Sequence, residues 1–376
     1  MGYQYRKRKV IPQPHREFKI GNGRISGYGS LFLGSLSLSA VFAYRYPAYL
    51  TTTQLRAAYD AEFLQIILKY GMWFSLFLGT ITFLINRRKR LGITGIILTL
   101  MAFALGGYNL PIGSVEPKSL ALGVDWLILA FLGSTLIFTA LEKIFPKYKK
   151  QVILRDEWGL DFFYFCFNHL LISAVLLVGN FLVSQSQWIM NSNLHNLVQS
   201  LPLAVQVFIL LICADFVLYW EHRIFHDIPR LWPFHAVHHS VETLDWLAGS
   251  RSHVSQVFIE RSLVMLCLYY IGATQAALDI YVTIATLQAI VIHCSLGFDW
   301  GILKYVIVAP QYHHWHHSSE QPAIDTNYAA HTPLFDRLFK TYHMPSKHWP
   351  AEYGTTKRLP RNFVGQLLYP FTGYRK

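Results

Sequence analysis

The sequence predicts an all-α membrane protein, in which a multi-pass helical bundle lies under a cytoplasmic helical cap. Two properties of the whole chain support this fold class. Its 376 residues are 53% hydrophobic and only 14% charged, whereas soluble domains devote about a quarter of their residues to charged side chains. The apolar residues also come in long blocks, which is the pattern of membrane-spanning helices. A third property, the spacing of the histidines, predicts what the cap holds.

Eight apolar blocks are candidates for the helices of the bundle. They lie at roughly 28–44, 63–85, 91–107, 122–145, 161–184, 201–220, 255–272 and 275–293. A helix needs about 20 residues to cross the hydrocarbon layer of a bilayer. The blocks at 28–44 and 91–107 are the shortest and therefore the weakest candidates for a full span. Only Gly-Ala-Thr separates the last two blocks, so we expect a helical hairpin there.

Basic residues flank these blocks mainly on one side of the expected membrane. The net charge is +12, and the segments 6–24, 87–90 and 143–155 together hold sixteen Lys and Arg residues. The opposing loops hold three, at Arg45, Arg56 and Lys118. This asymmetry follows the positive-inside rule and predicts a cytoplasmic amino terminus, with the histidine-rich segments on the same side. The basic clusters form no face with stacking aromatic residues, so nucleic acid is excluded as a partner.

The same pattern divides the chain into four expected regions. Residues 1–27 form a basic cytoplasmic tail, and residues 28–157 form an N-terminal membrane region of about four helices. Residues 158–343 contain the histidine-rich segments. Residues 344–376 form a C-terminal tail whose apolar stretch from Phe363 to Tyr369 suits the membrane interface. The four cysteines are solitary, so we expect no thiolate metal site.

Fourteen of the 17 histidines lie between His222 and His348, many of them at helical spacing. Side chains three or four positions apart share one face of a helix, and neutral imidazole is a preferred ligand of iron, copper and zinc. The clusters read His222-x-x-x-His226, His235-x-x-His238-His239 and His313-x-x-His316-His317. We therefore expect a histidine metal site in the cap, with His253 and His293 as isolated further candidates.

The number of candidate ligands suits two metal ions, because one iron or zinc ion takes four to six donors. Two ions held about 3.5–4 Å apart can activate one small molecule between them. A metal-bound imidazole usually donates its second N–H group to a carboxylate or a carbonyl. Asp227 and Asp325 are candidates for this role, and ordinary helix caps or solvated loop charges are the equal alternative for both.

Two other classes of membrane protein would also be rich in histidine. A metal transporter usually binds its ion near the middle of the bilayer on discontinuous helices, whereas these clusters lie at helix ends. A membrane scaffold with a structural zinc ion needs four ligands in a closed site, and this chain offers twice that number in its clusters. Both alternatives are weaker than a catalytic two-metal site.

The three clusters resemble the histidine boxes of the fatty acid hydroxylase/sterol desaturase superfamily, over roughly residues 155–343. Three segments are most similar to alkylglycerol monooxygenase-like and bacterial sterol desaturase family proteins. These segments are His235–Ser240, Asp325–Tyr328 and Leu334–Phe339. The resemblance implies a multi-pass membrane enzyme whose di-iron centre faces the cytoplasm, in a bacterial inner membrane or the endoplasmic reticulum.

Enzymes of this superfamily use O2 and external electrons to hydroxylate or desaturate a C–H bond of a lipid or sterol. An alkylglycerol (ether lipid) monooxygenase activity is the alternative. The chain has no flavin, haem or nicotinamide fingerprint, so the resemblance implies a separate electron donor, either a reductase or a small carrier. The implied iron ligands are His222, His226, His235, His238, His239, His293, His313, His316 and His317, with His253 as a weaker tenth.

Overall fold

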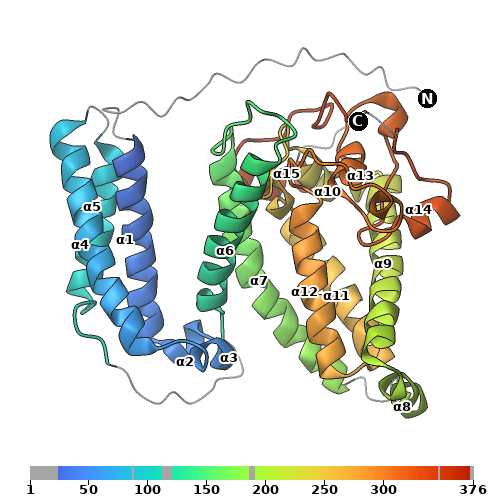
Figure 1. Ribbon diagram of the computed structural model, residues 1–376, viewed down its shortest axis with the longest axis horizontal. Helices are drawn as coiled ribbons and strands as arrows, with labels where there is room; N and C mark the ends of the chain where they lie inside the picture. The colour runs from blue at the N-terminus through green and yellow to red at the C-terminus, as the bar shows by residue number, and fades with distance from the viewer. Residues whose placement is uncertain (1–23, 87–88, 112–120, 186–190, 346–347, 373–376) are drawn as a thin grey trace. The chain divides into compact units, whose positions relative to one another are not determined.

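The computed structural model describes residues 24–86, 89–111, 121–185, 191–345 and 348–372 (Figure 1). In these ranges the regular structure is helical, and the β interactions are two isolated bridges. The expected all-α fold is therefore confirmed. The described residues fall into two compact units, one within 24–131 and the other from Leu132 onward. Residues 1–23 of the expected basic tail lie outside the described residues.

The first unit is a bundle of three long helices with small residues at their contacts. The long helices are α1 (Arg24–Arg45), α4 (Ala61–Ile85) and α5 (Arg90–Ala104), and the short ones are α2 (Pro47–Leu50) and α3 (Thr53–Arg56). The Ser75 hydroxyl lies 2.9 Å from the carbonyl oxygen of Ser30 and 2.7 Å from the Thr99 hydroxyl. Small side chains at the contacts, and hydrogen bonds made by buried hydroxyl groups, let membrane helices approach closely.

The second unit contains five long helices, the nine-residue α8 (Ser192–Ser200) between two of them in the chain, and a set of short helices. The long helices are α6 (Val124–Ile144, in this unit from Leu132), α7 (Trp158–Gln185), α9 (Leu203–Asp227), α11 (Val254–Ile271) and α12 (Gln275–Val291). The short helices are α10 (Trp232–His239), α13 (Pro310–His316), α14 (Leu334–Leu338) and α15 (Phe363–Thr372). Figure 1 shows α10, α13 and α15 gathered at one end of the bundle that α7, α9, α11 and α12 form.

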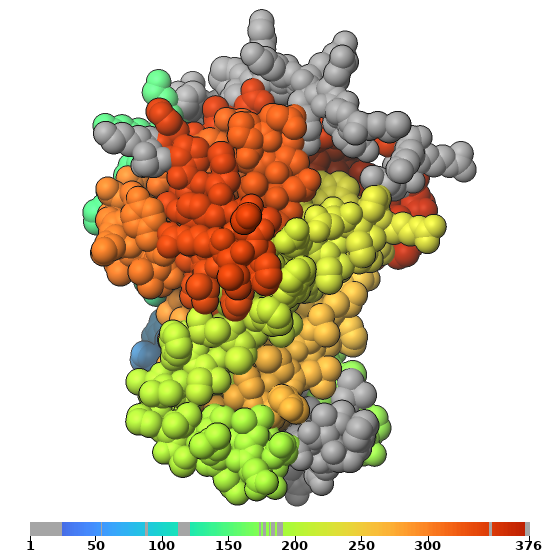
Figure 2. Space-filling model, turned by 90° about the vertical axis from the view of Figure 1, so that its right-hand side faces the viewer, coloured from blue at the N-terminus to red at the C-terminus, as the bar shows by residue number. Residues whose placement is uncertain are grey.

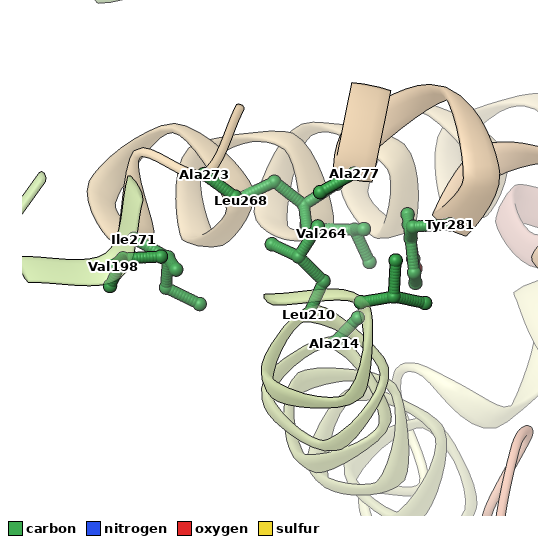
Figure 3. Close-up of a cluster of buried hydrophobic side chains, with 10 residues drawn as sticks. Val198, Leu210, Ala214, Val264, Leu268, Ile271, Ala273, Ala277 and Tyr281 are labelled. Carbon is green, nitrogen blue, oxygen red and sulfur yellow. The ribbon is translucent and has the colours of Figure 1, made fainter. Parts of the chain in front are cut away.

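An apolar core joins α9, α11 and α12 below these short helices (Figure 3). Leu210 and Ala214 of α9 face Val264 and Leu268 of α11, and Tyr281 of α12 completes the cluster. All five side chains are buried. Between helices that cross a bilayer, such a cluster is stabilised by van der Waals packing and not by removal of surface from water. This packing fixes how α9 faces α11 and α12.

Five of the described helices are long and apolar enough to cross a membrane. They are α1, α4, α6, α9 and α11, and the shorter apolar helices are α5 and α12. The expected helices at all eight apolar blocks are present, although the block at 91–107 forms a helix of only 15 residues. These findings support an integral membrane protein. The expected hairpin is also present, since Gly272 adopts a left-handed φ of 68° and ends α11 before α12 begins.

The buried carboxylate of Asp215 and the partly buried carboxylate of Glu142 hold the segments around the short helices by accepting backbone hydrogen bonds. Asp215, on α9, accepts from the N–H groups of Ala330, His331 and Thr332 at 2.7–2.9 Å. Glu142, at the end of α6, accepts from the N–H groups at positions 246 and 295, both at 2.9 Å. Figure 2 shows the segment with α13 and α14, in red-orange, lying over the end of α9, in yellow-green.

Replacement of Gly95 by alanine should destabilise the first unit. A Cβ atom at Gly95 would lie 2.5 Å from the backbone carbonyl carbon of Ser30, so α1 and α5 would have to move apart. Overpacking of this kind costs about 1–3 kcal/mol, and we expect a lower thermal melting temperature for the purified protein in detergent. The same change at Gly71 is the control, because a Cβ there meets nothing within 4 Å. Equal melting temperatures for the two variants would contradict this packing.

Candidate metal centre

Nine histidines of the second unit form two groups that could each hold a metal ion. Within each group the candidate ligand atoms all lie within 4.8 Å of one another. The first group consists of His222, His226, His235, His239 and His316, and the second of His238, His293, His313 and His317. The structure therefore brings together nine of the ten histidines that the sequence suggested as ligands.

In α10 and at α13, two rings four residues apart join the same group, and a ring between them joins the other group. In α10, His235 and His239 are four residues apart and belong to the first group, whereas His238 belongs to the second. In α13 the pattern is reversed, since the first and last members of its cluster join the second group and His316 joins the first. Each short helix starts with a proline in its first turn, which favours a defined helix start.

Backbone carbonyls determine which ring nitrogen carries the proton in several of these histidines. The Nδ1 atoms of four rings lie 2.8–2.9 Å from carbonyl oxygens, in the pairs His222–Tyr328, His316–Thr326, His238–Arg251 and His293–Ala289. A carbonyl oxygen can only accept a hydrogen bond, so in each pair Nδ1 carries the proton. The Nε2 atom of each neutral ring is then a free lone pair, which is the form that binds a metal ion.

These Nε2 atoms point at one another. His238 and His293 both donate from Nδ1, yet their Nε2 atoms lie only 3.2 Å apart with no proton between them. Two facing lone pairs repel unless a cation lies near both. In addition, the buried Nε2 atoms of His226 and His316 have no hydrogen-bond partner among the described residues. This donor set of neutral nitrogens fits transition-metal ions such as iron, copper or zinc.

Burial keeps the rings outside α9 in their neutral form. It lowers the pKa of His238 to about 4. Desolvation, reinforced by neighbouring histidines, holds the pKa values of His239 and His317 well below their ordinary value. A ring with a lowered pKa is uncharged at neutral pH, so no proton has to leave before a metal ion binds.

The two carboxylates that the sequence suggested as partners of metal-bound histidines, Asp325 and Asp227, have different partners in the structure. Asp325 lies 3.2 Å from Nδ1 of His226, which is the carboxylate–histidine contact that the sequence suggested. Asp227 instead pairs with Arg223 one helical turn away, at 3.1 Å.

His253 lies outside both groups. Its Nδ1 accepts from the backbone N–H of Ser255 and caps α11, and its Nε2 lies 3.1 Å from the carbonyl oxygen of Leu367. Because both ring nitrogens have partners, we leave His253 out of the proposed ligand set. His314 also lies outside the two groups, with Nδ1 2.9 Å from the Tyr353 hydroxyl.

Further polar residues brace the centre, and sequence reasoning did not single them out. Asp336 accepts from the backbone N–H groups of Tyr328 and Ala329 and from the Tyr312 hydroxyl. Asn327, with a left-handed φ of 62°, donates to the carbonyl oxygen of Tyr312. Both residues lie in segments quoted above for the family resemblance, so that resemblance was the available signal. They join α13 to the loop whose carbonyls orient His222 and His316.

A buried ionic network supports the second group. Arg155 makes two hydrogen bonds to the Asp245 carboxylate, at 2.8 and 2.9 Å, and a further bond to Asp161. Arg251 binds Asp161 from the other side, and its carbonyl oxygen is the acceptor for His238. The charges are removed from water, but each lies beside a charge of opposite sign, which is the condition under which a buried network is tolerated.

Residues 207–341 match the sequence model of the fatty acid hydroxylase family. Over these residues the chain is similar to that family. The matched region runs from within α9 to the segment after α14 and contains all nine histidines of the two groups. No solved structure matches the chain.

Several characterised proteins are similar to parts of the chain. The ornithine lipid hydroxylase of Rhizobium tropici is 33% identical over 174 residues, which are 46% of this chain and 52% of that protein. The alkylglycerol monooxygenase of Danio rerio is 30% identical over 129 residues, which are 34% of this chain and 28% of that protein. Methylsterol monooxygenase 2-2 of Arabidopsis thaliana is 24% identical over 116 residues, which are 30% of this chain and 44% of that protein. The matches thus span about half or less of these relatives.

Replacement of Arg155 by alanine should strongly destabilise the second unit. The change leaves Asp245 buried without its cation, and breaking one partner of a buried pair costs about 3–5 kcal/mol. Denaturant titration of the purified protein measures the loss. Arg361→Ala is the matched control, because Arg361 is 56% exposed and its ion pairs with Asp156 and Glu157 should contribute at most about 1 kcal/mol. Similar losses in both variants would contradict the role of the network.

Replacement of His293 by alanine should weaken metal binding at the second group, because the group would lose one of its four candidate ligands, and the purified protein should therefore contain less metal than the wild type. Elemental analysis of the purified protein measures the metal content. His253→Ala should keep the wild-type metal content while it loses a helix cap worth about 1 kcal/mol. A loss of metal in His253→Ala, or none in His293→Ala, would contradict the assignment of the two groups.

Proposed function

We propose that this chain is a membrane-bound di-iron oxygenase that hydroxylates a C–H bond of a lipid, using O2 and electrons from a separate donor. The observation that carries the proposal is the pair of buried histidine groups in a region similar to the fatty acid hydroxylase family. The characterised relatives support hydroxylation rather than desaturation, because they are named as hydroxylases and monooxygenases. We assign this activity to residues 158–343.

In this proposal the nine histidines hold two iron ions. Iron would supply the redox chemistry by which O2 is activated, which zinc cannot do. The protein keeps the rings outside α9 neutral by burial, and it orients several of the nine rings through hydrogen bonds to their second nitrogen. No side chain outside the two groups is assigned as an acid or base.

The helices beneath the centre favour a substrate that resides in the membrane. The ligand-bearing end of α9 continues directly from a helix apolar enough to cross a bilayer, and α11 begins beside the same groups. A C–H bond of a lipid chain could therefore reach the centre without leaving the bilayer. The basic flanking segments support a cytoplasmic position for the centre, where a soluble reductase or electron carrier would have access.

The relatives suggest three substrate classes. The similarity to an ornithine lipid hydroxylase favours an amino-acid-containing lipid, and that to alkylglycerol monooxygenases favours an ether lipid. The similarity to a methylsterol monooxygenase is weaker in identity, so a sterol is the third choice.

Cells that produce the protein under ¹⁸O2 should contain a lipid with one added ¹⁸O atom, detected by mass spectrometry of total lipids. The mass of the labelled headgroup and chains separates the substrate classes. Cells with the His316→Ala variant should lack this lipid, although the protein is still present in the membrane. A new double bond without label would indicate desaturation instead. An unchanged lipid profile at normal iron content would contradict the proposed oxygenase.

A further inference from the structure

His235 differs from the other candidate ligands in the kind of chemical group that its second ring nitrogen contacts. Among the described residues, four candidate ligands face backbone carbonyls and His226 faces a carboxylate. Nδ1 of His235 instead lies 3.0 Å from Oε1 of Gln256, a side-chain amide in the first turn of α11. Gln256 is 4% exposed, so water does not compete for this contact.

An amide side chain does not by itself fix the proton of an imidazole. A carbonyl or carboxylate oxygen only accepts hydrogen bonds, but glutamine can present either its oxygen or its NH2 group. With the NH2 group toward His235, the proton of the ring would move to Nε2. That atom lies 2.9 Å from Nε2 of His222 and 3.0 Å from Nε2 of His239, at the centre of the first group. A proton there would block the lone pair that a metal ion needs.

The structure has the other orientation. The amide oxygen of Gln256 faces His235, so Nδ1 of the ring carries the proton and Nε2 keeps its lone pair. Glu221, which is buried on α9 next to His222, interacts with the side chain of Gln256. A carboxyl oxygen at this place favours the observed orientation, because the NH2 group of Gln256 can donate to it. The contacts run from α9 through α11 to α10.

We infer that Gln256, held by Glu221, is a positioning residue that keeps the Nε2 lone pair of His235 directed into the first histidine group. This inference rests on the proposed function, because it assumes that the group holds a metal ion. It adds to that proposal two residues that touch neither the metal nor the substrate but set the form of a ligand.

The test uses the full-length protein, purified without metal and titrated with Fe(II) or, for its visible absorption, with Co(II). Gln256→Met keeps the size of the side chain but removes the amide. We expect it to bind metal about 10–100-fold more weakly at the first group, as for other residues that orient metal-bound histidines, and to change the Co(II) absorption. Gln206→Met is the matched control. Gln206 is a buried glutamine whose side chain accepts from Thr274, at the end of α9 away from the histidines.

An exchange of the two side chains keeps the test informative if Gln256→Met folds poorly. In the double variant Glu221→Gln with Gln256→Glu, the amide donates from position 221 and the carboxylate at position 256 accepts from both neighbours. We expect this variant to recover most of the metal affinity and the wild-type Co(II) absorption. The single change Glu221→Gln places two amides together and should weaken binding.

Three results would overturn the inference. They are wild-type affinity and absorption in Gln256→Met, the same loss in the control Gln206→Met, or no recovery in a well-folded exchange variant. Failure of the proposed function is distinguishable, because the wild-type protein itself would then bind no pair of metal ions.

Discussion

The structure depends on the convergence of nine neutral imidazole rings inside one buried region. Each ring must lose its contact with water, and many of them must direct a lone pair at another lone pair. Such an arrangement is unfavourable unless the rings are held in place from their outer side and a cation lies among the lone pairs. The carbonyls of residues 289, 251, 326 and 328 supply much of that outer support, so the backbone of the cap is as important to the centre as the histidines themselves.

The support for this backbone comes from carboxylates that accept main-chain N–H groups. Asp215 holds the loop after residue 329 against α9, and Asp336 holds the segment that supplies the carbonyl of Tyr328. The Arg155 network holds Arg251 and therefore the acceptor of His238. These groups form a layer of ionic and hydrogen-bonded contacts between the apolar bundle and the short helices. The same bundle anchors α9 through its core with α11 and α12, so apolar packing and polar bracing act on one helix.

Much of the fold could be predicted from the sequence, because long apolar blocks leave a helix as the main way to satisfy the backbone in a bilayer. The spacing of the histidines likewise predicted that α9, α10 and α13 carry the candidate ligands. The sequence could not show that His238 and His239, adjacent in the chain, belong to different groups, since that depends on how the helices face one another. His253 and His293 looked equivalent as isolated histidines, but only the tertiary contacts show that His253 caps α11. Gln256 gave no signal, because a single glutamine has no pattern.

The short helices α10 and α13 each contribute to both histidine groups. Neither helix can turn or slide without shifting rings on both sides at once. The spacing between the two groups is therefore a property of how these helices are seated together, and it is insensitive to the motion of any one ring. Two metal sites on separate loops could move independently of each other, whereas two sites that share α10 and α13 must move together.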